Sequence, residues 1–228
     1  MRSLAVLLFA LPLLAQPPVS RSTYVKSDEK LNLDPGSKLW KKAPVSVMAV
    51  TPPGPAAPAA LKTEVRSRWS GKHLYFLFSC PYEKLNLKPD LDAKNETNKL
   101  WEWDVVEIFI GGEFDNIWRY REYQVSPRAE WVDLDIDRKK PLPEGGWRWN
   151  SNFEAAARID EAKKIWYVAM KIPVASINGA EAKAGKELRV NYYRLDGVAP
   201  NRTSITWTPT GNRNHHTPEK FGLLRLEK

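Results

Sequence analysis

From residue 62 onward the chain consists mainly of short runs in which hydrophobic and polar residues alternate or hydrophobic residues stand together. Alternation with a period of two is typical of a strand with one buried face, and a short apolar run is typical of a fully buried strand. Only residues 173–183 (PVASINGAEAK) suggest a helix, which would be short and begin at Pro173. The predicted strands lie within residues 62–69, 73–80, 104–112, 118–127, 129–137, 147–149, 152–160, 164–172, 188–195, 203–209 and 221–228.

Turn residues separate these segments. Ser70-Gly71-Lys72 and Pro127-Arg128 each stand between two predicted strands, and the Pro/Ala stretch at 51–60 cannot pair in a sheet and must be a loop. About eleven strands at intervals of about a dozen residues favour a two-sheet antiparallel β-sandwich of the immunoglobulin-like or jelly-roll kind. No internal repeat or linker divides the chain, so we expect one domain over residues 39–228, after a polar lead-in at 17–38.

The first residues have a different composition. Arg2 precedes an apolar run that ends in the small residue Ala15, which is the layout of a secretory signal peptide and is too short to span a bilayer. We expect cleavage near residue 16, secretion or periplasmic export, and no membrane insertion afterwards. The single cysteine, Cys80, stands in an apolar strand and excludes an internal disulfide.

The formal net charge of +8 adds little to the prediction of function. Basic residues occur singly or in pairs, without the stripe or module motif of a nucleic-acid interface. No nucleic-acid partner is therefore expected, although a preference for acidic ligands such as uronic-acid polymers stays open.

Aromatic and acidic residues gather in residues 100–107 (LWEWDVVE), at the mouth of a predicted strand. A sugar ring presents an apolar face of C–H bonds and a rim of hydroxyls, so an exposed tryptophan beside carboxylates or amides suits it. The chain has ten tryptophans, and several of them fall in predicted loops. This combination favours carbohydrate binding.

Several segments in order, from LYFLFSC through LWEWDVVEIFIGG and ITWTP to the closing PEKFG, resemble the family 9 carbohydrate-binding modules. The resemblance covers about Leu39 to the C-terminus and implies a sandwich that clamps the end of a sugar chain between two tryptophans and binds structural calcium. Carried over to this sequence, Trp101 and Trp207 resemble the clamp, and Glu107 resembles the hydroxyl-reading carboxylate. Gln124 stands where the family has an arginine, and the asparagine expected before Trp207 is missing. We add Arg194 as a further hydroxyl contact.

Metal and haem sites are weaker interpretations. Asp104, Asp133 and Asp135 could supply oxygen ligands to calcium, although an exposed acidic strand explains the last two equally well. His215 and His216 are expected to form a polar rim beside Trp207. Haem, as in related DOMON-like modules, would need a methionine ligand such as Met48 or Met170, and no C-x-x-C-H motif is present.

A glycoside-acting hydrolase would need two carboxylates about 5–10 Å apart across a cleft. Asp104 and Glu107 are three residues apart in a strand and therefore face opposite ways. We predict an exported protein that binds oligo- or polysaccharide without cleaving it and assists polysaccharide capture or breakdown by secreted glycoside hydrolases. No cofactor is required, and structural calcium is left open.

Overall fold

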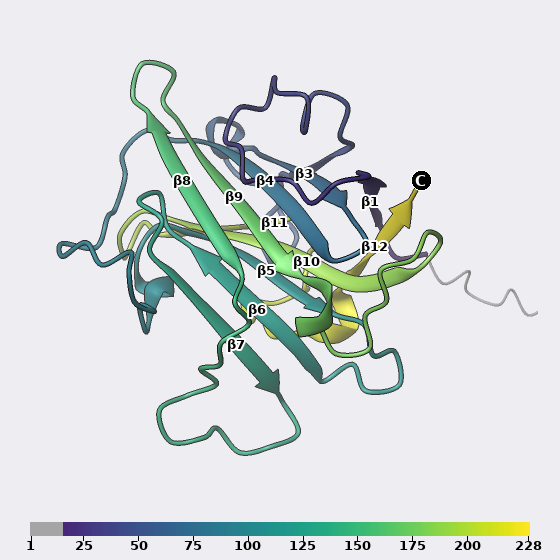
Figure 1. The fold of residues 1–228 in the computed structure, drawn as a ribbon. Helices are drawn as coiled ribbons and strands as arrows, with labels where there is room; N and C mark the ends of the chain where they lie inside the picture. The colour runs from purple at the N-terminus through teal and green to yellow at the C-terminus, as the bar shows by residue number, and fades with distance from the viewer. Residues whose placement is uncertain (1–15) are drawn as a thin grey trace, which may run out of the picture.

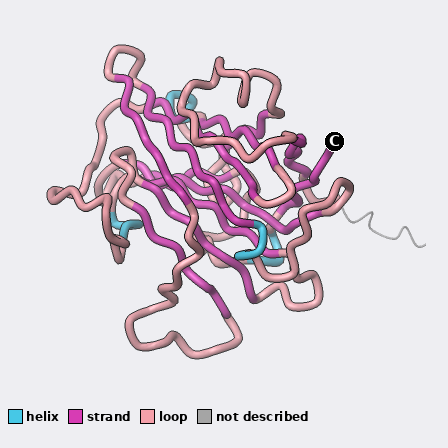
Figure 2. The backbone as a smooth tube through the Cα atoms, viewed as in Figure 1, coloured by secondary structure: helices cyan, strands magenta, loops and turns pink. Residues whose placement is uncertain are grey.

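The structure is a computed structural model that describes residues 16–228. Residues 1–15, which hold most of the expected signal peptide, lie outside the described residues. The described chain is built of strands and of 3-10 helices of three residues each (Figures 1 and 2), which confirms the all-β prediction. The expected helix at 173–183 is only the 3-10 turn Val174–Ser176. Among the described residues, no helix is long and apolar enough to cross a membrane.

The strands are β1 (Val19–Tyr24), β2 (Val45–Met48), β3 (Thr63–Trp69), β4 (His73–Pro81), β5 (Val105–Gly111), β6 (Arg119–Val125), β7 (Trp131–Asp137), β8 (Glu154–Asp160), β9 (Ile165–Pro173), β10 (Glu187–Asp196), β11 (Thr203–Thr206) and β12 (Gly222–Glu227). The 3-10 helices are η1 (Ala59–Leu61), η2 (Leu100–Glu102), η3 (Val174–Ser176) and η4 (Pro218–Lys220).

Hydrogen bonds join all of these strands into one 12-stranded sheet in the order β7-β6-β5-β10-β12-β1-β3-β4-β9-β8, with β11 beside β10 and β2 beside β3. Two separate sheets are therefore not confirmed. The connection is made by β1, which pairs in parallel with β12 on one side and with β3 on the other. This strand lies in the segment expected to be a polar lead-in.

The sheet folds over a central core to which most strands contribute one face. On β5, Val106, Ile108 and Ile110 enter this core, while Val105 and Phe109 belong to a second cluster on the other face. Both faces of β5 are therefore covered, and every residue of the strand is buried. Glu107 alternates with Val106 and Ile108 and so points to the face of the second cluster, as the sequence predicted.

The lead-in segment 25–43 packs against the outer faces of β4 and β9. Trp40 is fully buried there, and its indole N–H donates to the Asn32 carbonyl at 2.7 Å. Asp28 anchors the same segment: the Tyr75 hydroxyl donates to its Oδ1 at 2.6 Å, and the Lys171 ammonium donates to its Oδ2 at 3.0 Å. His73 Nδ1 lies 2.7 Å from Asp28 Oδ1.

These contacts predict how acid affects the fold. The Tyr75 hydrogen bond, followed by Lys171 and His73, lowers the pKa of Asp28 from 3.8 to about 2. A lowered carboxyl pKa gives stability that is fully present above the unfolded value and is lost as the pH falls toward about 2. In Asp28→Asn we expect stability at neutral pH to drop by on the order of 1 kcal/mol or less, because the side chain is half exposed and screened. Its acid decline between about pH 4 and pH 2 should be shallower.

Urea unfolding at several pH values measures both effects. Asp115→Asn, an exposed aspartate for which the structure gives no ion pair, is the matched control. Equal pH slopes in Asp28→Asn and the parent protein would contradict the prediction.

Candidate functional site

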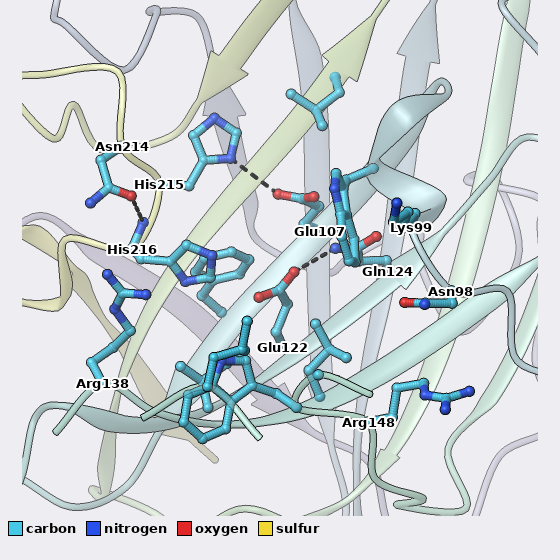
Figure 3. Close-up of a pocket in the computed structure, with 18 of the residues that line it drawn as sticks. Asn98, Lys99, Glu107, Glu122, Gln124, Arg138, Arg148, Asn214, His215 and His216 are labelled. Atoms are coloured by element: carbon cyan, nitrogen blue, oxygen red, sulfur yellow. Dashed lines mark hydrogen bonds and ion pairs between the residues drawn. The ribbon is translucent and has the colours of Figure 1, made fainter. Parts of the chain in front are cut away.

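A pocket of about 590 Å³ opens on the face of the sheet formed by β5, β6, β7 and the end of β10. This volume falls within the range of ligand sites, roughly 300–1,000 Å³. Its floor is made by side chains of neighbouring strands, and its walls come from η2, the loop after β7 and the loop before η4 (Figure 3).

The floor has a polar half set by strand register. Glu107 on β5 stands opposite Gln124 on β6, and Glu122 follows two residues away on the same face. All three side chains line the pocket although their residues are at most 3% exposed. The Gln124 amide donates to Glu122 Oε1, whereas Glu122 Oε2 and Gln124 Oε1 have no hydrogen-bond partner among the described residues. These buried oxygens require partners from a ligand or from water.

The carboxyls of Glu107 and Glu122 lie close together in a buried floor, so it would be costly to charge both of them. Burial, followed by the charge of nearby Glu107, raises the pKa of Glu122 well above 4.5. The protonated form of Glu122 is therefore favoured, and in that form the carboxyl can donate a hydrogen bond. The remaining floor is apolar and consists of Phe109, Leu134 and Ile136.

Two tryptophans line the pocket above this floor. Trp101 on η2 is 36% exposed, and Arg202 fixes its loop by donating to the carbonyls of Trp101 and Trp103. Trp147 is half-buried against the second cluster. Its segment was predicted as a strand and lies along β7, with the Asp135 amide donating to the Trp147 carbonyl at 2.9 Å.

The loop before η4 brings two histidines to the pocket. The His215 ring stacks on Tyr193 with centroids 4.4 Å apart and an interplanar angle of 7°. Its Nδ1 lies 3.3 Å from Glu107 Oε2 and its Nε2 lies 2.7 Å from the Ser204 hydroxyl. His216 Nδ1 lies 2.7 Å from the Tyr120 hydroxyl. Burial, followed by Arg138 and His215, lowers the pKa of His216 to about 4, so this ring is neutral at neutral pH.

Ser204, His215 and Glu107 thus stand in the order of nucleophile, base and carboxylate. Ser204, however, is not among the residues that line the pocket. In this arrangement its hydroxyl and the Glu107 carboxylate hold the His215 ring in one orientation, and the pocket presents the imidazole to a ligand.

Comparisons with known proteins show the family to which the chain belongs. The model of the family described as carbohydrate family 9 binding domain-like matches residues 35–228. The chain belongs to this family.

Solved structures with the same fold include other members of the family. A Bacteroides uniformis protein that has been proposed to bind carbohydrate matches with a TM-score of 0.73 and 15% identity over 93% of this chain and 100% of its own. A family 9 carbohydrate-binding module from Caldicellulosiruptor kristjanssonii in complex with cellotriose matches at 0.65 and 13% identity, over 92% and 94% of the two chains. Its complex with glucose matches at 0.62 and 14%, over 91% and 96%. No curated protein sequence matches significantly.

The structure brings together Trp101, Glu107 and Gln124, but it does not bring Trp207 or Arg194 to the pocket of this family 9-like protein. Trp207 packs on Tyr192 with centroids 5.4 Å apart and lies against Gly222. The expected Trp101–Trp207 clamp is therefore corrected: the tryptophans that share the pocket are Trp101 and Trp147.

Arg194 is fully buried on the opposite face of β10. It donates to Thr63 Oγ1 at 3.0 Å and to Asp196 at 2.5 Å, and its guanidinium lies over the Trp166 ring. A side chain held in this way acts within the core and does not reach a ligand in the pocket.

The three aspartates expected to bind calcium do not form one site. Asp104 accepts hydrogen bonds from the Asn86 and Gly197 amides at 2.8 and 2.7 Å. Asp133 accepts from the Ser151 amide at 2.6 Å, and Asp135 pairs with Arg121. Residues 16–228 hold no group of three or more histidine, cysteine, aspartate or glutamate residues placed to bind a metal ion. The set therefore does not fit calcium. Met48 and Met170, the candidate haem ligands, are fully buried in the central core.

Sequence reasoning did not assign Glu122 and did not pair Trp147 with Trp101. Glu122 was detectable in principle, because it precedes Gln124 by two residues and shares its face. His215 and His216 were expected at a polar rim, and they do lie at the rim, although of the Trp101 pocket.

The contact of Trp207 with Gly222 explains why glycine follows Phe221 in the closing motif. A Cβ at residue 222 would lie 2.5 Å from the Trp207 ring and 2.7 Å from the Pro18 carbonyl oxygen.

Gly222→Ala is therefore expected to lower the free energy of unfolding by about 1–3 kcal/mol, and Trp207→Ala by about 2 kcal/mol or more. Chemical denaturation measures both. Gly71→Ala, where a Cβ meets nothing within 4 Å, is the control. If Trp207→Ala is as stable as the parent protein but no longer binds the ligand, the predicted clamp of Trp101 and Trp207 would be supported.

The raised pKa of Glu122 predicts that stability falls with increasing pH. The unfolded chain releases this proton near 4.5 while the folded chain retains it, so stability declines from pH 4.5 upward until the folded pKa is reached. Glu122→Gln should remove this decline and therefore raise the stability at pH 7 relative to that at pH 4.5. Thermal unfolding at pH 4.5 and pH 7 measures the difference, with the exposed Glu144→Gln as control. Parallel pH profiles for Glu122→Gln and the parent protein would contradict the assignment.

Proposed function

We propose that the protein binds carbohydrate in this pocket without cleaving it. The observation that carries the proposal is the set of buried, unpartnered oxygens on Glu122 and Gln124 beneath a solvent-exposed indole, Trp101. A ligand that satisfies both must present an apolar face to the indole and several hydroxyls to the floor. A saccharide has this chemistry.

The floor supplies a mixed set of hydrogen-bonding groups. Glu107 accepts from a hydroxyl, protonated Glu122 donates, and the Gln124 amide oxygen accepts. His215 contacts Ser204 through Nε2 and Glu107 through Nδ1, and so helps to hold the Glu107 carboxylate in place. A sugar that lacks one of the matching hydroxyls leaves a buried group unpaired, so this floor is expected to select for configuration. Trp101 and Trp147 supply the apolar contact, and the affinity for a short oligosaccharide should be micromolar or weaker.

The pair Glu107 and Glu122 invites the alternative of a glycoside hydrolase, because burial raises the pKa of the Glu122 carboxyl, as in a general acid, beside a second carboxyl. A glycosidase places its two carboxyls on either side of the scissile bond. Here both carboxyls belong to adjacent strands of one floor and reach a ligand from the same side. Binding without hydrolysis is the function that this arrangement supports.

The predicted signal peptide at residues 1–16 supports action outside the cytoplasm, where secreted glycoside hydrolases would be partners in polysaccharide breakdown. The family 9 module of Caldicellulosiruptor kristjanssonii, whose structures hold cellotriose and glucose, makes β-glucan oligosaccharides a reasonable first probe. The ligand contacts proposed here involve side chains alone, so binding should persist when calcium is chelated.

Replacement of Trp101 tests the proposal. Trp101→Ala should weaken oligosaccharide binding at least tenfold, about 1.4 kcal/mol, because the apolar contact is lost. Glu107→Ala should have a similar effect by removing a hydroxyl acceptor and a His215 contact. Isothermal titration against a panel of neutral and charged oligosaccharides, with and without chelator, measures both.

Trp118→Ala is the matched control, because Trp118 is also 36% exposed but does not line the pocket. Unchanged affinity in Trp101→Ala would remove the proposed site. Sustained release of reducing ends by the purified parent protein would show that it is a hydrolase.

A further inference from the structure

The mouth of the pocket is unusually basic. Lys99, Arg138, Arg148 and Arg213 all line it, and all four residues are exposed. None of the four forms an ion pair within residues 16–228. Other arginines of the protein are paired, for example Arg128 with Glu130 at 2.9 Å. The four unpaired cations are therefore a feature of the pocket and not only of the basic composition.

These cations come from separate parts of the chain. Lys99 precedes η2, Arg138 follows β7, Arg148 lies beside Trp147, and Arg213 lies in the histidine loop. In Figure 3, Arg138 lies on one side of Glu122, and Lys99 and Arg148 lie on the other. The fold thus places like charges around one opening, where their mutual repulsion is tolerated because water screens it.

The negative charge of the pocket lies below them, on the floor. Of the lining residues only Glu107 and Glu122 are acidic. The protonated form of Glu122 is favoured, and Glu107 lies 3.3 Å from His215. The pocket therefore has at most one negative charge at its base and four positive charges at its mouth. A ligand that places hydroxyls on the floor and an anionic group at the mouth matches this distribution.

We propose that the saccharide bound in this pocket is anionic, with a carboxylate or sulfate group held at the mouth by Arg138, Arg148, Arg213 and Lys99 while neutral hydroxyls contact Glu107, Glu122 and Gln124. This inference rests on the proposed function and specifies its ligand class. Arginine is suited to this role because its planar guanidinium pairs with carboxylate and sulfate oxygens through two hydrogen bonds.

Matched oligosaccharides test the inference. Each probe is compared as a neutral chain, as its C6-oxidised uronic acid form and as its 6-O-sulfated form, on gluco-, manno- and galacto-configured backbones. Titration at low and high salt is expected to give at least tenfold tighter binding of an anionic form than of its neutral parent, with an advantage that shrinks as salt increases. The tighter of the two anionic forms identifies the group as carboxylate or sulfate.

Two triple variants separate specific recognition from general attraction. Arg138→Gln, Arg148→Gln and Arg213→Gln together should abolish the anionic preference, so that the variant binds the anionic form no more tightly than the neutral form. Lys41→Gln, Lys42→Gln and Lys183→Gln change the net charge equally at exposed positions outside the pocket and should retain the preference. Trp101→Ala should weaken binding of the anionic and neutral forms alike.

The outcomes are distinguishable. If neutral and anionic forms bind equally and without salt dependence, the inference is wrong and carbohydrate binding stands. If the control triple variant loses the preference as fully as the pocket variant, or if anionic binding survives Trp101→Ala, the attraction is nonspecific and the inference is also wrong. If no saccharide of the panel binds the folded protein, the proposed function fails, and the ligand class fails with it.

Discussion

The burial of β5 on both faces is the constraint on which the site depends. One face of the strand is anchored in the central core by Val106, Ile108 and Ile110. The other face must then carry Glu107 into a protected position, where a carboxylate is costly unless it is partnered. The site resolves this cost locally: the His215 ring lies beside Glu107, and burial favours the protonated form of neighbouring Glu122, which adds no second charge. The apolar half of the strand thus supplies the stability that allows a polar floor.

The continuous ladder of the sheet supports this floor from the β10 side. β10 pairs with β5 on one side and with β12 on the other, and β1 continues the ladder from β12 to β3. The strands under the pocket therefore have no free edge on that side. Moving Glu107 out of register with Gln124 would require the ladder to slip by whole residues. The walls of the pocket are held differently from its floor. The 3-10 helix η2 and the histidine loop are fixed by individual side-chain contacts, such as those of Arg202 and Tyr193, and not by a strand ladder.

The strands and the outward direction of Glu107 could be predicted because both follow from alternation, a property of adjacent residues. The same rule pairs Gln124 with Glu122. The fate of Trp207 could not be predicted, because its short motif, ITWTP, has the same polar neighbours as a loop-mouth tryptophan. What decides its position is Gly222, whose missing side chain leaves space for the indole. Arg194 was wrongly predicted to contact the ligand for a similar reason: its buried partners, Thr63 and Leu61, are more than a hundred residues away in sequence. The role of β1 was missed because its two buried residues, Ser20 and Ser22, are polar, so the segment lacks the hydrophobic alternation of a half-buried strand.

Floor and mouth supply different parts of recognition. The buried floor groups cannot exchange a lost ligand contact for water easily, so a mismatched hydroxyl is costly and the floor discriminates between configurations. The exposed cations remain hydrated when the pocket is empty, and each contributes little alone. Together they attract an anionic chain from a distance and pair with its carboxylate or sulfate group at the mouth. A site built in this way would select a sugar configuration at the floor and an anionic substituent at the mouth.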